Sequence, residues 1–201
     1  MSTMTPDASD QALSTPAKPS ARERLLAAAD ELFYAEGIHT VGIDRIIEHA
    51  GVAKASLYNT FGSKDELVRA YLTGRHESRQ VRITKRLAEY DTPREKLLGV
   101  FDALMDYVAL PTFRGCAFAN ASAESQPGGV VDEVSTSNRT WTRALLTDLA
   151  REAGANDPAA HAQQLMLVYD GTITGARMDH RPAVGADARR TAEILIDSAT
   201  A

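Results

Sequence analysis

The chain has 201 residues, of which 44% are hydrophobic and 24% charged, and its formal net charge is −5. It is long enough for one or two hydrophobic cores, and no run reaches the roughly 18 apolar residues that a membrane span requires, so we expect no membrane partner. Its start lacks a secretory signal and its only cysteine, Cys116, cannot form an internal disulfide, which indicates a cytoplasmic protein, while the negative charge argues against nucleic acid as a partner.

Residues 1–19 are rich in Ser, Thr, Pro, Asp and Ala and have almost nothing apolar to bury, which predicts a disordered N-terminal arm. Order is expected from Ser20, because Ser20 and Glu23 match a capping box. Apolar residues then recur at helical spacing as far as Gly37, a residue typical of helix ends.

Two short helices are predicted next, over 43–50 and 54–61, separated by the turn 51–53. Either Thr40 or Gly42 is suited to cap the first of them, and the sequence leaves both open. Further helices are expected from Ser63 to about Tyr90, from Thr92 to Pro111, over 114–126, from about Val131 to Ala153, from Asp157 to a break at 181–185, and from there to the C-terminus. No segment shows sustained period-two alternation, so the prediction is an all-α fold of about nine helices.

Residues 37–66 read GIHTVGIDRIIEHAGVAKASLYNTFGSKDE, a short helix, a tight turn that starts at Gly51, and a second short helix. This order is that of a helix-turn-helix, whose second helix enters the major groove of DNA. A plain pair of packed helices has the same pattern, so geometry alone leaves DNA binding and simple packing equally open.

The residues of this motif resemble the TetR family of bacterial transcriptional repressors. The resemblance lies in Ala50-Gly51-Val52, Lys54, Leu57-Tyr58, Phe61 and Ser63-Lys64-Asp65-Glu66-Leu67. It implies a three-helix DNA-binding head over 20–66 and a larger effector-binding and dimerisation domain over 67–201. It also implies a homodimer that binds operator DNA, responds to an unknown small molecule, and acts as a repressor. The chain departs from the family where Val41 and Gly42 replace usual hydroxyl residues and where Thr60 replaces a usual His or Tyr.

The resemblance assigns the recognition segment to residues 54–60, with Lys54 and Ser56 near the end that approaches base edges. Tyr58 and Lys64 are expected on phosphates, although a half-buried tyrosine and a solvated lysine are the alternatives. Arg24 and Lys18 are additional candidates for contacts with the DNA backbone. The predicted DNA-binding residues are Arg22, Thr40, Arg45, Lys54, Ala55, Ser56, Tyr58, Asn59, Thr60 and Lys64.

The charge of the chain does not exclude DNA binding, although acidic residues slightly outnumber basic ones between positions 20 and 75. A head of mixed charge suits DNA only if its basic residues lie on one side. Two such heads in a dimer would read half-sites about 34 Å apart.

The last two helices are the candidates for the dimer interface, because small residues allow close helix approach and apolar residues supply contact. The predicted interface residues are Gly171, Gly175, Ala176, Leu195, Ile196 and Ala199. Packing within one chain is the alternative.

The effector pocket is expected around the stretch 111–124, where Cys116, Asn120 and Glu124 are four residues apart and would share one helix face. Such a row suits the polar side of an apolar cavity, although a buried cysteine and an exposed glutamate on an Ala-rich helix fit equally well. The predicted pocket residues are Phe101, Met105, Phe113, Cys116, Phe118, Asn120, Glu124, Trp141, Met166, Tyr169 and Asp170.

The sequence contains no recognisable catalytic constellation, and its five histidines lack the spacing of metal ligands, so we expect neither a cofactor nor an enzyme. The competing hypothesis is a helical enzyme or metal-binding protein that uses Glu124, Asp170 and a histidine.

Overall fold

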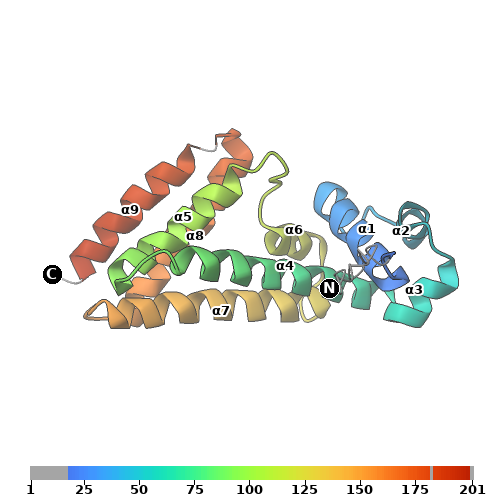
Figure 1. Ribbon diagram of the computed structural model, residues 1–201, viewed down its shortest axis with the longest axis horizontal. Helices are drawn as coiled ribbons and strands as arrows, with labels where there is room; N and C mark the ends of the chain where they lie inside the picture. The colour runs from blue at the N-terminus through green and yellow to red at the C-terminus, as the bar shows by residue number, and fades with distance from the viewer. Residues whose placement is uncertain (1–17, 182, 200–201) are drawn as a thin grey trace, which may run out of the picture.

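The computed structural model describes residues 18–181 and 183–199, so residues 1–17, most of the expected N-terminal arm, lie outside it. The described residues form nine α-helices and no strand, which confirms the all-α prediction. Figure 1 shows α1–α3 gathered at one end of the molecule, here called the head, while α4–α9 form an elongated body. The helices are α1 (Ala21–Glu36), α2 (Ile43–Ala50), α3 (Lys54–Phe61), α4 (Lys64–Leu87), α5 (Pro93–Val108), α6 (Ala117–Glu124), α7 (Val130–Glu152), α8 (Pro158–Asp179) and α9 (Val184–Ala199).

Local caps start the helices where the sequence places them. Ser20 and Glu23 form the reciprocal capping box of α1, and Thr92 and Glu95 form that of α5. Gly42, rather than Thr40, is the N-cap residue of α2, and it has no side chain to bond the free N–H groups.

The helix α6 is shorter than the predicted span 114–126. Gly115 has a φ of +97°, and Cys116 is extended, with φ −83° and ψ 116°, so the helix begins only at Ala117. Cys116 is therefore the N-cap residue of α6 and not part of its regular turns.

Two hydrophobic cores divide the molecule, and α4 contributes to both. The first core joins α1–α3 to the beginning of α4, to α6 and to the start of α7. The second joins Ile83 and Leu87, near the end of α4, to α5, α7, α8 and α9. The predicted domain boundary at residue 66 thus lies just before Leu67, Val68, Tyr71 and Leu72, which belong to the core of the head.

Candidate DNA interface and ligand cavity

The turn between α2 and α3 is held by Arg24 from α1. Gly51 adopts a left-handed conformation, with φ +60° and ψ 44°, which favours glycine. The Nη1 atom of Arg24 donates to the carbonyl oxygens of Ala50 at 3.1 Å and Gly51 at 2.8 Å. These carbonyls lie at the C-terminal end of α2, where a cation is favourable. Arg24, considered above for a phosphate contact, therefore joins α1 to the end of α2 and the first residue of the turn.

The helix α3 presents most of its surface to solvent. Leu57 is its only buried residue, and Phe61 is half-buried against the same core. Ser56 is half-buried, whereas the other residues predicted for DNA contact on this helix are exposed: Lys54, Ala55, Tyr58, Asn59 and Thr60. Leu57 and Phe61 thus anchor α3 to the core, and most of its other residues are open to solvent.

Ion pairs inside the head occupy two of the predicted DNA-binding cations. The Nζ atom of Lys54 lies 2.8 Å from the Oδ1 atom of Asp44, and this hydrogen bond raises the pKa of Lys54 above its ordinary value. Arg45 pairs with both carboxylate oxygens of Glu36. Both pairs are largely exposed and are therefore weak, so a phosphate can compete for the cations.

The remaining predicted DNA-binding residues lie on the head or at the start of α4, where Lys64 is half-buried. The guanidinium of exposed Arg22 lies over the ring of Phe61 at 5.7 Å, and the ammonium of Lys64 lies 6.0 Å from the ring centroid of Phe33. Thr40 is exposed, and the hydroxyl of Thr60 donates to the carbonyl oxygen of Ser56 at 2.6 Å.

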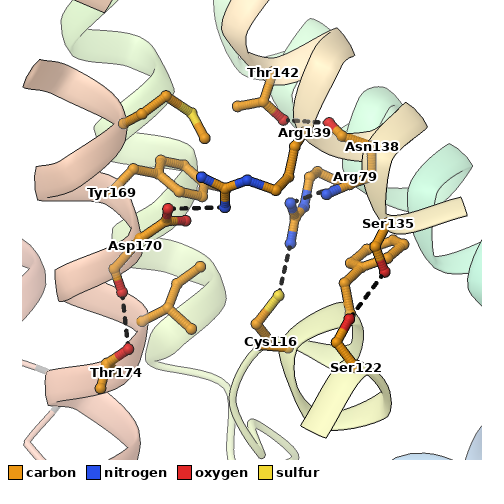
Figure 2. A pocket seen from close by; sticks show the side chains of 14 residues that line it. Arg79, Cys116, Ser122, Ser135, Asn138, Arg139, Thr142, Tyr169, Asp170 and Thr174 are labelled. Atoms are coloured by element: carbon orange, nitrogen blue, oxygen red, sulfur yellow. Dashed lines mark hydrogen bonds and ion pairs between the residues drawn. The ribbon is translucent and has the colours of Figure 1, made fainter. Parts of the chain in front are cut away.

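A cavity of about 290 Å³ lies in the body, where α4, α6, α7 and α8 meet. Figure 2 shows Arg79, Arg139, Cys116 and Asp170 converging on it from different helices. We call it the Arg79 cavity. Its lining is Arg79, Cys116, Phe118, Ala119, Ser122, Ser135, Asn138, Arg139, Thr142, Met166, Tyr169, Asp170, Ile173 and Thr174.

Five of the predicted pocket residues line this cavity, namely Cys116, Phe118, Met166, Tyr169 and Asp170. The structure places the other six elsewhere. Phe101 packs against the ring of Tyr169, Met105 against Gly185, Phe113 against Tyr107, and Trp141 against His76, while Asn120 donates to the carbonyl oxygen of Arg114 and Glu124 reaches the head.

The expected row of Cys116, Asn120 and Glu124 does not form, because Cys116 precedes the helix. The polar side of the cavity comes instead from Arg79 on α4 and from Asn138, Arg139 and Thr142 on α7, which sequence reasoning missed. The arginines of α4 can be seen in the sequence, but nothing in the sequence indicates that Arg79 points into the protein.

Glu124 connects the body to the head. One of its carboxylate oxygens accepts the backbone N–H of His39 at 2.7 Å, in the loop between α1 and α2. A Cβ atom on Gly37 would lie 2.6 Å from the other oxygen, and the φ of Gly37 is +94°. The helix α6 thus lines the Arg79 cavity with Phe118, Ala119 and Ser122 and contacts the head through Glu124, its last residue. A more open groove of about 410 Å³ lies beside this contact between α6 and the head.

The predicted interface residues of α8 and α9 fall into two groups. Ala176 and Ile196 are buried within the chain and Leu195 is half-buried against its core, whereas Gly171 is exposed, and Gly175 and Ala199 are half-buried. The large apolar side chains that these helices expose are Leu167 (65% exposed), Met178 (72%) and Ile194 (65%).

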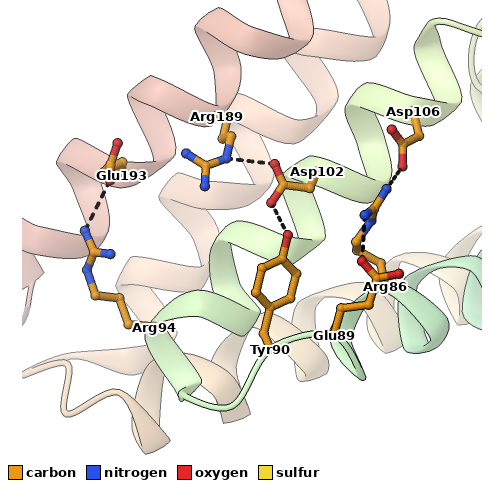
Figure 3. A network of polar contacts seen from close by, with 8 residues as sticks. All are labelled: Arg86, Glu89, Tyr90, Arg94, Asp102, Asp106, Arg189 and Glu193. Carbon is orange, nitrogen blue, oxygen red and sulfur yellow. Dashed lines mark hydrogen bonds and ion pairs between the residues drawn. The ribbon is translucent and has the colours of Figure 1, made fainter.

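A polar network fixes the inner side of α9 against α5. Figure 3 shows Asp102 between Arg189 and Tyr90, each at 2.7 Å. Arg94 at the start of α5 pairs with Glu193 and Asp197 of α9. The two helices are therefore joined within the chain.

The side chains named by the competing metal or enzyme hypothesis do not assemble. Glu124 binds the head, whereas Asp170 pairs with Arg139 at 2.9 Å beside the cavity. In the part of the chain that the structure describes, no three His, Cys, Asp or Glu side chains gather as metal ligands would. None of the described helices combines the length and apolar character that a membrane crossing requires.

Comparison with known proteins agrees with this geometry. Residues 25–71 match the family model described as "Bacterial regulatory proteins, tetR family", and residues 93–192 match "Tetracyclin repressor-like, C-terminal domain". The crystal structure of SCO4454, a TetR-family transcriptional regulator from Streptomyces coelicolor, is 33% identical, with a TM-score of 0.86 over 90% of this chain and 96% of that one.

Two further relatives extend the comparison. The transcriptional regulator YjdC of Escherichia coli is 26% identical over 87% of this chain and 93% of its own length. The transcriptional activator FasR of Mycolicibacterium smegmatis is 27% identical over 73% of this chain, and the match spans 65% of that relative.

Proposed function

The chain belongs to the TetR family of bacterial transcriptional regulators, and from this premise we propose that it is a homodimeric repressor that releases its operator when a small molecule occupies the Arg79 cavity. The observation that carries the proposal is the position of this cavity. It lies against α4, which runs into the core of the head, and against α6, which ends on the head at Glu124.

Operator binding is assigned to the exposed face of α3. Lys54 and Ser56 near its start meet base edges, while Tyr58 and the adjacent Lys64 meet phosphates. The head has few basic residues, so two copies must act together on half-sites about 34 Å apart.

Release follows from a shift between two conformations. A ligand that prefers one arrangement of α4 and α6 favours the head positions belonging to that arrangement. If the two recognition helices are then wrongly spaced for successive major grooves, operator affinity falls by the same factor by which DNA weakens ligand binding.

The dimer is proposed to form through the outer faces of α8 and α9. Leu167, Met178 and Ile194 are large, apolar and more than half exposed there, and burying them against a second copy is favourable. Symmetric dimers are the commonest soluble assemblies, and a two-fold axis suits a palindromic operator.

The test is binding to the DNA upstream of the chain's own gene, measured by gel shift at several salt concentrations. We expect a sequence-specific shift that weakens with salt, and a loss of at least about tenfold in affinity for the double variant Tyr58→Ala, Lys64→Ala. The control is Lys85→Ala, an exposed lysine near the far end of α4. Full affinity in the double variant would refute the site assignment, and no specific shift at low salt would refute the function.

A further inference from the structure

Arg79 carries a buried positive charge that no carboxylate neutralises. Its side chain is 7% exposed, and none of the ion pairs among the described residues involves it. One Nη atom donates to the Oδ1 atom of Asn138 at 3.2 Å, and the other lies 3.8 Å from the Sγ atom of Cys116. A guanidinium has five N–H donors, so these two neutral partners leave most of them unused.

Three other arginines lie near Arg79, and two of them are paired with carboxylates. Arg75 is paired with Asp30, and Arg139 with Asp170. Arg82 takes part in no ion pair among the described residues: its guanidinium carbon lies 4.2 Å from the ring centroid of Tyr107, and its Nε atom has no hydrogen-bond partner. Arg82 lines two neighbouring cavities, of about 120 Å³ and about 220 Å³, but not the Arg79 cavity, which therefore faces one unpaired cation.

Aromatic and apolar side chains lie on one side of Arg79. Its guanidinium carbon lies 5.2 Å from the ring centroid of Phe118 and 5.9 Å from that of Tyr169, and Met166 and Ile173 complete this side of the cavity. Rings partly compensate a cation but do not replace a counter-ion. An unpaired charge at such a depth costs stability, and a protein retains it where a ligand supplies the opposite charge.

We propose that the effector of this regulator is a small organic monocarboxylate with an apolar body, its charge neutralised by Arg79. This proposal rests on the function proposed above and names the chemical class of its effector. A planar guanidinium binds a carboxylate through two parallel hydrogen bonds. One unpaired cation calls for one negative charge, and about 290 Å³ is near the lower end of ligand sites, which favours a small molecule.

The first experiment measures the melting temperature of the protein with benzoate, 2-naphthoate and octanoate, each beside its neutral primary amide, and with phenyl phosphate. We expect at least one carboxylate to raise the melting temperature while its amide does not. In Arg79→Met the affinity for that carboxylate should fall about 10- to 100-fold. In Arg143→Gln, an exposed residue of α7 outside the cavity, it should not change.

Several results would overturn the proposal: equal stabilisation by amides and carboxylates, stabilisation by phenyl phosphate alone, retention of the effect in Arg79→Met, or no stabilisation by any carboxylate. Gel shifts with the same proteins separate this outcome from the proposed function. If operator binding persists while every carboxylate fails, only the ligand class is wrong. If carboxylates bind through Arg79 but operator DNA is not bound, the regulatory function is wrong and the anion site stands.

A second measurement distinguishes a ligand-binding arginine from a structural one without any ligand. Arg79→Met leaves no buried acceptor without a partner, because the Oδ1 atom of Asn138 also lies 3.2 Å from the Nδ1 atom of His76. We therefore expect Arg79→Met to melt at a higher temperature than the unliganded wild type. A lower melting temperature would assign Arg79 a structural role and count against the proposal.

Discussion

At the scale of single residues, Gly37 and Glu124 show how one backbone angle supports a contact between distant parts of the chain. Gly37 has a φ of +94° and a ψ of 153°, a region that only glycine occupies readily. The missing side chain also leaves room for the Glu124 carboxylate. A larger residue at position 37 is therefore unfavourable for two independent reasons.

We expect Gly37→Ala to lower the free energy of unfolding by about 1–3 kcal/mol, from backbone strain together with the clash against Glu124. The control is Gly74→Ala in the middle of α4, where an added Cβ meets nothing within 4 Å. That change should instead stabilise the protein by about 0.5–1 kcal/mol. Urea denaturation of both variants measures the difference, and equal effects of the two changes would contradict this account.

The buried imidazole of His161 predicts that the stability of the folded protein depends on pH. It is 3% exposed, and burial lowers its pKa below the ordinary value of 6.5, an effect that the Gln164 side chain partly offsets by hydrogen bonding. The unfolded chain therefore binds more protons than the folded protein below about pH 6.5, so stability is full above this pH and falls as the pH drops toward the depressed pKa.

Denaturation curves between pH 7.5 and about pH 5.5 should show a smaller loss of stability in His161→Leu than in the wild type. His39→Leu, which alters an exposed histidine in the loop between α1 and α2, is the control and should lose stability about as steeply as the wild type. Identical slopes for wild type and His161→Leu would show that His161 does not cause the effect.

At the scale of elements, Arg24 and Arg22 are neighbours on α1 with different tasks. We expect Arg24→Met to lower stability by about 1–2 kcal/mol and to weaken operator binding, because the carbonyls at the end of α2 lose their donor. Arg22→Met should leave stability nearly unchanged and reduce the salt dependence of DNA binding by about one phosphate contact per head. Thermal denaturation and gel shifts on both variants test this. An equal loss of stability in both would refute the assignment of a structural role to Arg24 and of a DNA contact to Arg22.

Helix starts could be predicted from the sequence because their causes are local. Ser20 with Glu23, Thr92 with Glu95, and Asp157 each bond N–H groups within three residues, and such signals are visible in the chain itself. The beginning of α6 was predicted too early, because Gly115 and Cys116 leave the helical region.

The residues that line the Arg79 cavity could not be predicted in the same way. Arg79 and Asn138 lie 59 positions apart and meet only because α4 packs against α7. A helix with Arg75, Arg79 and Arg82 reads as a solvated basic face, and only the packing of α6 and α8 turns Arg79 inward. The apolar residues Phe118, Met166 and Tyr169 were found because aromatic and large apolar side chains line cavities and cores alike.

At the scale of the whole molecule, the outer face of α8 and α9 predicts the oligomeric state. Ile194→Glu should shift the protein toward monomers and weaken binding to a palindromic operator, because the charge would be buried between two copies. Val81→Glu is the matched control, since Val81 on α4 is 67% exposed and Ile194 is 65% exposed. Sedimentation velocity measures the oligomeric state of both proteins. An unchanged dimer in Ile194→Glu would show that the interface lies elsewhere.

The sharing of α4 between two cores has a consequence for how this regulator can be divided or recombined. A fragment that ends at residue 66 lacks Leu67, Val68, Tyr71 and Leu72, four apolar residues that complete the interior of the head. A transplant of the head onto another regulator must therefore carry α4 at least through Leu72, and its new junction must preserve the contact that Glu124 makes with the loop before α2. Because the same helix stabilises both ends, the two parts are expected to melt in a single cooperative transition.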